Sequence, residues 1–242
     1  MPQMDTLVVI PTYNEAANLP HLVRRIFSLE IPNLALLFVD DNSPDGTADI
    51  AQSYEADWPG SIHVLRRSTK DGLGPAYIAG FQEAVRLKAK YVVQMDADLS
   101  HPPEYIPALL ESLNHCDVAV GSRYIPGGGA TEDWGTFRHL LSQGGDFYVR
   151  AILGMHTRDS KSGFKAFRSV VLDSIDFGNI HSKGYIFQAE FLYLCHRFGY
   201  SIKEIPFVFQ NRTAGRSKLS MRIIVEALWR PIFIRWHTRI SR

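Results

Sequence analysis

Two aspartates, Asp96 and Asp98, stand two residues apart at the point where an apolar run ends and a Ser-His-Pro-Pro turn begins. Carboxylates at this spacing can hold a hard divalent cation that also binds the oxygens of a phosphorylated ligand. An isolated Asp-x-Asp can equally be a solvated turn after a strand. The pair therefore raises the hypothesis of an enzyme that acts on a nucleotide-activated substrate.

Basic residues in the second half of the chain could bind a second phosphate. Arg123 follows an apolar run, and Arg212 and Lys218 flank a short Ala-Gly segment. Arg138 and Ser142 are four residues apart and would share one face of a helix. Arginine's planar guanidinium suits phosphate oxygens, although a solvated surface position is the alternative. If the second phosphate accepts a transferred sugar, its attacking oxygen is already ionised near neutral pH. We therefore expect an inverting displacement at the anomeric carbon that needs no dedicated general base.

The elements that must position these residues alternate between strands and helices. Apolar runs predict strands at 7–10, 35–39, 61–65, 91–95 and 118–120. Apolar residues at helical spacing predict helices at 15–29, 75–88 and 104–114. This order predicts an α/β fold with a mostly parallel sheet covered by helices on both faces. Ligands bind at the carboxyl ends of such strands, where the polar segments 11–15, 40–45 and 96–100 would meet.

Length and composition indicate one domain with one sizeable core, since the chain has 242 residues and 45% hydrophobic content. A net charge of +1 argues against nucleic acid as a partner. Cys116 and Cys195 lie in no metal or disulfide spacing, which predicts two inert buried thiols in a reducing compartment. No signal-peptide pattern and no window of roughly 18 apolar residues is present. We therefore expect a cytoplasmic protein with peripheral contact to the cytoplasmic face of a membrane.

An ordered set of motifs resembles family two glycosyltransferases, and most closely the dolichol (polyprenol) phosphate mannose synthases. The motifs cover nearly the whole chain, at 11–15, 39–47, 72–74, 95–102, 121–124, 163–165, 183–188 and 212–219. The resemblance implies a GT-A fold, GDP-mannose as donor, a polyprenyl monophosphate as acceptor, and Mg²⁺ or Mn²⁺. Sequence alone leaves open UDP-glucose or another nucleotide sugar as donor, and a catalytically silent subunit that only binds lipid phosphate.

The resemblance also implies roles for single residues. The metal ligands would be Asp96, Asp98 and Ser100, and Ser100 stands where some relatives have a glutamine, which leaves the choice of metal open. The donor site would comprise Pro11, Tyr13, Glu15, Val39, Asp41, Asp96, Ala97, Asp98, Arg123, Arg212 and Lys218. The acceptor phosphate would be bound by Arg123, Arg138, Ser142 and Arg212. The catalytic residues would be Asp98, Arg123 and Arg212.

Several polar residues have a structural interpretation beside the functional one. Asn14 or Glu15 could cap the helix that follows them, and we expect Asp40 and Asp45 to be structural. The loop Gly72-Leu73-Gly74 could cradle phosphate or allow close backbone packing. We expect His101 to shape its turn. Glu190 could orient the arginines of the acceptor site.

Within the single domain we expect a donor half at about 1–122, an acceptor half at about 123–218 and a basic amphipathic segment at 219–242. Gly127-Gly128-Gly129 is interpreted as a mobile loop. From Arg212 onward the chain has eight Lys or Arg and one acid, interleaved with tryptophans and aliphatic residues. This composition is typical of an interfacial helix on an anionic membrane, which Pro231 would break in two. The alternatives are a helix packed on the core and a helix packed on a partner, such as a small membrane-anchoring subunit.

Overall fold

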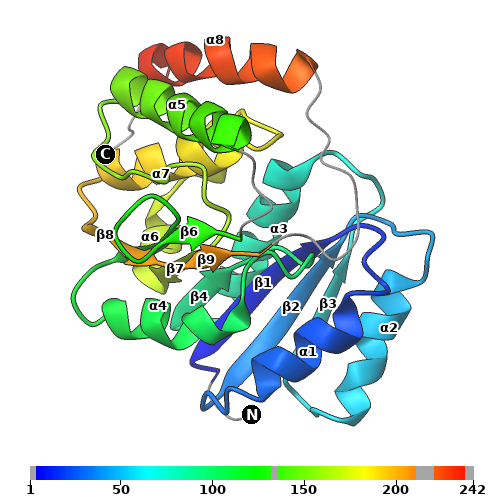
Figure 1. The fold of residues 1–242 in the computed structure, drawn as a ribbon. Coiled ribbons are helices and arrows are strands. Elements are labelled where there is room, and N and C mark those ends of the chain that lie inside the picture. The colour runs from blue at the N-terminus through cyan, green and yellow to red at the C-terminus, as the bar shows by residue number, and fades with distance from the viewer. Residues whose placement is uncertain (1–3, 132–135, 211–220, 238–242) are drawn as a thin grey trace.

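The computed structural model describes residues 4–131, 136–210 and 221–237, with the backbone alone described at 136–142 and 221–227. Its centre is a seven-stranded sheet in the order β3-β2-β1-β4-β7-β5-β8 (Figure 1). The strands are β1 (Thr6–Thr12), β2 (Leu34–Asp40), β3 (Ile62–Arg66), β4 (Tyr91–Gln94), β5 (Val118–Ser122), β7 (Lys165–Arg168) and β8 (Ile202–Pro206). All pairs are parallel except those of β7, which runs antiparallel to both β4 and β5.

Helices cover both faces of this sheet, as the sequence predicts (Figure 1). They are α1 (Leu19–Phe27), α2 (Thr47–Ser53), α3 (Leu73–Arg86), α4 (Ile106–Ser112), α5 (Thr136–Leu153), α6 (Ser169–Ser174), α7 (Phe187–Arg197) and α8 (Met221–His237). Short 3-10 turns occupy Tyr54–Ala56, Pro103–Tyr105 and Phe177–Asn179. The predicted α/β class is confirmed.

The alternation of β1 shows how the core is divided between the two faces. Leu7 and Val9 pack in the cluster that includes residues of α3, α6 and α7. Val8 and Ile10 pack on the opposite face with residues of α1 and α4. Successive side chains of a strand point to opposite faces, so a continuous apolar run is what a strand buried on both sides requires.

The strand order places the predicted site at one edge of the sheet. From β1 the chain passes outward through β2 and β3, and β4 then pairs with β1 on its other side. The carboxyl ends of β1 and β4 therefore meet where the order reverses, which is the usual ligand position in such sheets. β5 runs in the same direction as β4 because both are antiparallel to β7. Arg123 after β5 and Asp96 after β4 consequently share this edge.

Two local features differ from the simplest interpretation of the sequence, and at Pro231 the prediction was wrong. The segment Gly127-Gly128-Gly129 is a tight turn that leads into β6 (Gly129–Ala130), which pairs with β9 (Val208–Phe209). A Cβ on Gly128 would lie 2.3 Å from the carbonyl oxygen of Ser122, so this glycine permits a close backbone contact. Pro231 lies inside a continuous α8 instead of breaking it.

Packing explains why α8 continues through Pro231. Proline removes one backbone donor and disturbs the preceding turn. Here the carbonyl oxygen of Leu228 accepts a hydrogen bond of 2.6 Å from the hydroxyl of Tyr148 on α5. Ile234 is buried in the core, and α5 and α8 lie side by side (Figure 1). The helix thus packs on the protein, and no helix in the described ranges is long and apolar enough to cross a membrane.

Candidate functional site

The two aspartates of the Asp-x-Asp motif follow β4 at the site edge. Asp96 is half-buried, and its Oδ1 accepts a hydrogen bond of 2.7 Å from the hydroxyl of Tyr77 on α3. Asp98 is buried, and its Oδ1 accepts from the backbone amide of Ser100 at 3.1 Å. The motif is therefore an ordered turn with one oxygen of each carboxylate in a described hydrogen bond.

The residues of this turn fit a divalent cation that shares its ligands with a phosphorylated substrate. Among the described residues no group of three or more His, Cys, Asp or Glu side chains forms a closed metal cage. Magnesium is commonly held by one or two carboxylates together with substrate phosphates, which suits Asp96 and Asp98. The hydroxyl oxygen of Ser100 is buried without a hydrogen-bond partner in the described part of the chain. An ion or its bound water would satisfy such an atom.

His101 shapes the turn, as predicted. Its Nδ1 accepts the backbone N–H of Asp96 at 3.0 Å, and its ring stacks on Phe164 at a centroid distance of 5.2 Å. Burial lowers the pKa of His101 although Asp96 and Asp98 act in the opposite direction. A neutral imidazole with an accepting Nδ1 fixes the backbone at the start of the motif.

Arg123, the predicted phosphate ligand, is held by a buried carboxylate. Its Nε and Nη2 donate to the two oxygens of Asp159 at 2.7 and 2.8 Å, and its backbone amide donates to the same carboxylate at 3.0 Å. Burial by itself would lower the pKa of Arg123, but the hydrogen bonds and charge of Asp159 outweigh it and raise the pKa above its usual value. The guanidinium is a fixed positive charge at the site edge.

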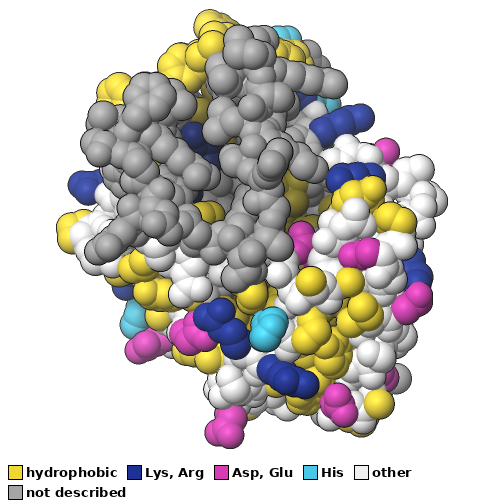
Figure 2. Space-filling model, turned by 45° about the vertical axis from the view of Figure 1, so that its right-hand side comes forward, with side chains coloured by type: hydrophobic (Ala, Val, Ile, Leu, Met, Phe, Trp, Pro, Cys, Tyr) yellow, Lys and Arg dark blue, Asp and Glu magenta, His cyan; other side chains and the backbone are white. Residues whose placement is uncertain are grey.

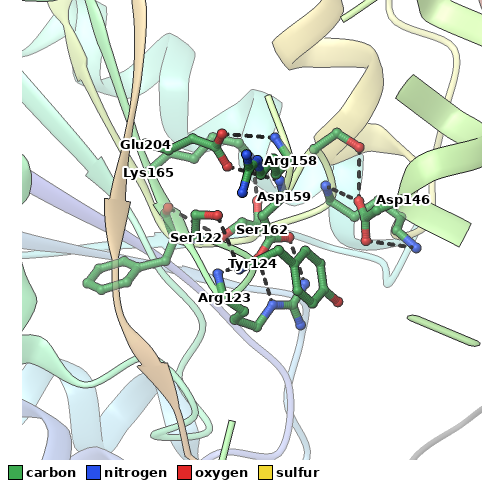
Figure 3. Close-up of polar contacts among 12 residues, drawn as sticks. Ser122, Arg123, Tyr124, Asp146, Arg158, Asp159, Ser162, Lys165 and Glu204 are labelled. Carbon is green, nitrogen blue, oxygen red and sulfur yellow. Dashed lines mark hydrogen bonds and ion pairs between the residues drawn. The ribbon is translucent and has the colours of Figure 1, made fainter. Parts of the chain in front are cut away.

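The loop that carries Asp159 is tied to two further carboxylates (Figure 3). Glu204 on β8 accepts the backbone amides of Arg158 and Asp159 at 2.9 and 3.1 Å. Asp146 on α5 accepts from the hydroxyl of Ser160 and the amide of Lys161. Burial raises the pKa of Asp146. Loop 158–161 is thus anchored to both β8 and α5.

The predicted nucleotide side has its own ion pairs. Asp41 pairs with Arg67, which also contacts Asp71. Burial raises the pKa of Asp41 although the charge of Arg67 opposes the shift. The ammonium of Lys70 lies 3.3 Å from the centroid of the Tyr13 ring, a close cation–π contact. The acid and the aromatic ring predicted here are therefore accompanied by two cations that the motifs do not indicate.

Other residues of the first two polar segments hold the backbone. Asp40 accepts from the hydroxyl of Thr12 at 2.9 Å and from the amide of Ser43, and Asp45 accepts from the amides of Ala16 and Thr47. These are the structural roles expected of both aspartates. Glu15 accepts a hydrogen bond from the amide nitrogen of the Asn18 side chain at 2.7 Å. The N-cap of α1 is Asn18, so the expectation that Asn14 or Glu15 caps this helix was wrong. The donor role of Glu15 stays a prediction.

The remaining residues predicted for the donor-substrate site differ in their solvent exposure. Pro11 is half-buried near the end of β1, whereas Val39 and Ala97 are buried. The Val39 side chain belongs to the core cluster beneath α3. Roles in donor binding for these three stay predictions.

The Gly72-Leu73-Gly74 loop serves backbone packing, the second of its two interpretations. The amide of Gly74 donates to the carbonyl of Lys183 at 3.0 Å. A Cβ on Gly72 would lie 2.6 Å from that carbonyl, and a Cβ on Gly74 would lie 2.5 Å from the carbonyl of Ser182. Glu190 holds the segment that packs against these glycines, since its two oxygens accept the backbone amides of His181 and Ser182. Arg212 and the side chain of Arg138 lie outside the description, so a role of Glu190 in orienting these arginines stays a prediction.

Lys165 is the least expected residue near the site. It lies on β7, is fully buried, and donates to the carbonyl of Ser162 and to Oε1 of Gln188, the latter at 2.7 Å. Burial lowers its pKa to about 7, while Asp159, Cys195, Asp96 and Asp146 act in the opposite direction. The Lys165 ammonium therefore interacts electrostatically with Asp96 of the Asp-x-Asp turn and with Asp159 of loop 158–161.

Some predicted residues cannot be placed. Arg212 and Lys218 lie outside the described residues. Arg138 and Ser142 belong to α5, which gives them the predicted helical spacing, but their side chains lie outside the description. The two cysteines are buried and free, and burial raises the pKa of Cys195 to about 12, in agreement with the predicted inert thiols.

The sequence reasoning missed Tyr77, Asp159, Glu204 and Arg67. Tyr77 is part of an apolar helix face, so its hydroxyl gives no periodic signal. Asp159 lies in a stretch without clean periodicity. A buried arginine after a strand does require a carboxylate partner, which is a reason to search for Asp159 but does not identify it.

Comparisons with known proteins identify the family to which the chain belongs. The family model described as "Glycosyl transferase family 2" matches residues 7–176. The undecaprenyl-phosphate mannosyltransferase of Micrococcus luteus is 44% identical over 225 residues, which is 93% of this chain and 91% of the relative. The polyprenol monophosphomannose synthase of Mycolicibacterium smegmatis is 41% identical, over 95% of this chain and 86% of the relative.

A more distant relative and a solved structure extend the comparison. The dolichol-phosphate mannosyltransferase of Pyrococcus furiosus is 39% identical over 99% of this chain and 66% of its own length. A crystal structure of glucosyl-3-phosphoglycerate synthase from Mycobacterium tuberculosis, with Mn²⁺, UDP and glucosyl-3-phosphoglycerate, has a TM-score of 0.67 at 18% identity, over 95% of this chain and 80% of that one. At this identity the likeness concerns the fold. With its GT-A sheet and a family match over most of its length, the chain belongs to glycosyl transferase family 2 and is a glycosyltransferase.

Proposed function

We propose that this glycosyltransferase transfers mannose from GDP-mannose to a polyprenyl monophosphate, with inversion and with the help of Mg²⁺ or Mn²⁺. One observation carries the proposal. Arg123, fixed by the buried Asp159, lies at the same sheet edge as the Asp96 and Asp98 carboxylates. The guanidinium could bind one phosphate group, and a cation held by the aspartates could bind the other. Such a site suits a reaction in which two phosphate groups must approach each other. The named mannosyltransferase relatives support the choice of sugar and acceptor.

The proposed step is a displacement at the anomeric carbon. An oxygen of the lipid phosphate forms a bond to C1 of mannose, the bond from C1 to the diphosphate oxygen breaks, and GDP leaves. A bound divalent cation would supply Lewis-acid stabilisation of the departing diphosphate. Asp96 and Asp98 would hold that cation, while Arg123 would hold and orient the attacking phosphate. The phosphate is ionised already, so no side chain has to remove a proton.

We assign the other predicted residues within the same proposal. Pro11, Tyr13, Glu15, Val39, Asp41 and Ala97 would line the donor site, and Arg138, Ser142, Arg212 and Lys218 would complete the binding of phosphates. The donor half would comprise about 1–122 and the acceptor half about 123–218. Ser100, whose hydroxyl is buried near the motif, would bind the cation directly or through water.

We further propose that the protein acts on the cytoplasmic face of a membrane and contacts it through α5 and α8. Exposed apolar side chains of these helices are Phe147, Leu228, Trp229, Ile232 and Trp236, the last with 80% of its surface exposed. Figure 2 shows apolar side chains gathered at the end of the molecule where α8 lies. Within 143–153 and 228–237 the only acid is the buried Asp146. Such a surface suits an anionic bilayer, and a small anchoring partner is the alternative occupant.

The test is a transfer assay with labelled GDP-mannose or UDP-glucose, a short polyprenyl phosphate, and either Mg²⁺, Mn²⁺ or a chelator. We expect labelled lipid only with GDP-mannose and a metal. Transfer from UDP-glucose alone would reject mannose as the sugar. No transfer from any donor would favour a subunit that only binds lipid phosphate, and undiminished transfer with chelator would reject the cation.

A further inference from the structure

Tyr77 contacts the Asp-x-Asp turn from the interior of the protein. It lies on α3 with no exposed surface, and its ring stacks against Phe81 and Phe187 at centroid distances of 5.9 and 6.0 Å. Its hydroxyl donates to Oδ1 of Asp96 at 2.7 Å. An ionised carboxylate can only accept, so the phenol is the donor in this bond.

This hydrogen bond restricts how Asp96 can bind a ligand. The Oδ1 atom is occupied by Tyr77, and among the described residues no hydrogen bond reaches Oδ2. A Cβ added to Gly163 would lie 3.4 Å from Oδ2 and 3.5 Å from Oδ1, so the glycine leaves space beside the carboxylate. Because a buried phenol holds Oδ1, Oδ2 is the oxygen suited to a metal.

A buried polar cluster lies behind the phenol. Nε2 of Gln94 donates to Oε1 of Gln188 at 2.5 Å, and the same oxygen accepts from Nζ of Lys165 at 2.7 Å. All three side chains are buried. Gln94 precedes Asp96 by two residues along β4 and its extension, and Gln188 follows Phe187, which stacks on Tyr77. Among the described residues Oε1 of Gln94 and Nε2 of Gln188 have no hydrogen-bond partner, so the cluster is only partly satisfied.

From these contacts we infer that Tyr77 is a positioning residue, which orients the Asp96 carboxylate so that a single oxygen binds the divalent cation. The inference rests on the metal dependence in the proposed function. Partners that hydrogen-bond to a metal ligand fix its orientation, and their loss usually weakens metal affinity by about 10–100-fold. Tyr77→Phe removes only the hydroxyl and keeps the ring in its stack.

The test is Mn²⁺ binding in the presence of GDP, followed by the electron paramagnetic resonance signal of free Mn²⁺. For Tyr77→Phe we expect a Kd about 10–100-fold higher than in the wild type, and turnover that recovers at saturating Mn²⁺. Tyr193→Phe is the matched control, because this buried tyrosine on α7 accepts from Arg197 at 2.9 Å and has no hydrogen bond to the motif. Its Mn²⁺ affinity should equal that of the wild type.

A second variant keeps the inference testable if Tyr77→Phe folds poorly. Replacement of Tyr77 by 4-aminophenylalanine keeps an N–H donor at the same end of the ring and should retain most of the affinity. A folded Tyr77→Phe protein with wild-type Mn²⁺ affinity would overturn the inference while leaving the proposed function intact. If wild type and Tyr193→Phe bind no Mn²⁺ with GDP, the cation itself is wrong and both proposals fall.

Discussion

The carboxylate of Asp159 receives three hydrogen bonds from Arg123, two from the guanidinium and one from the backbone amide. If the arginine moved away, the carboxylate of Asp159, which has no exposed surface, would lose this cation. Loss of one partner of a buried ion pair is costly because the other charge remains in a medium that solvates it poorly.

Asp159→Asn should therefore destabilise the protein and weaken its use of the acceptor. We expect a loss of about 3–5 kcal/mol in the free energy of unfolding, measured by urea denaturation. We also expect a higher KM for polyprenyl phosphate, since Arg123 loses its orientation. Asp146→Asn is the control, because Asp146 is buried and binds the same loop but has no described hydrogen bond to Arg123. An equal rise in KM for both variants would contradict the specific role of Asp159.

Asp98→Ala should remove turnover while the fold survives. The side chain accepts a hydrogen bond from the backbone amide of Ser100, and a single bond of this kind contributes only about 0.5–3 kcal/mol. Loss of Lewis-acid help worth several kcal/mol lowers the rate by orders of magnitude. Steady-state transfer assays and circular dichroism measure the two effects. Asp49→Ala removes an exposed carboxylate as a control, and near-normal activity of Asp98→Ala would refute the metal assignment.

Lys165 predicts a pH dependence of stability. Its pKa is about 7 in the folded protein, against 10.5 for an ordinary lysine. Between these values the folded state binds fewer protons than the unfolded chain, so the free energy of unfolding rises with pH. The penalty for the buried charge is fully present below about pH 7 and disappears toward pH 10.5.

Lys165→Met should remove this contribution, so that its free energy of unfolding rises less between pH 7 and pH 9 than that of the wild type. Urea denaturation at several pH values measures the difference. Lys203→Met, which replaces an exposed lysine of β8, should keep the wild-type slope. Equal slopes for the wild type and Lys165→Met would show that the lysine is not shifted.

The exposed tryptophans of α8 predict membrane binding. Trp229→Ala and Trp236→Ala should each lower partitioning onto anionic vesicles roughly tenfold, since burial of a large apolar side chain stabilises by about 1.5–3 kcal/mol. Flotation assays with and without added salt measure this partitioning. Val170→Ser, which changes an exposed apolar residue of α6, should have no effect. Unchanged flotation of both tryptophan variants would favour an anchoring partner.

The sequence was informative where a single physical rule dominates. The strands β1 and β2 are recognisable because a strand buried on both faces needs an unbroken apolar run. The turn at Asp96 is recognisable because its residue types suit a cation. The GT-A fold and the family follow from motifs spread over the whole chain, and both are confirmed.

The rest depends on contacts between distant segments. β7 was not predicted, because a charged residue such as Lys165 is not expected in a buried strand. Its burial depends on Gln188 and Ser162, which accept hydrogen bonds from its ammonium. The continuity of α8 through Pro231 depends on its packing on α5. Hydrogen bonds such as Tyr77 to Asp96 join residues of different elements, and no periodicity within one element reports them.

The reversed direction of β7 has a consequence for engineering. The segment before this strand arrives at the site edge, where the segments after β4 and β5 leave it. Asp159, at one end of that segment, binds the arginine proposed for the acceptor. Gly163, near the other end, lies beside the carboxylate proposed for the metal, where a Cβ would come within 3.4 Å of it. One stretch of a few residues thus borders both the arginine and the carboxylate. Substitutions within it should disturb the two proposed phosphate sites at once, so neither site can be redesigned without the other.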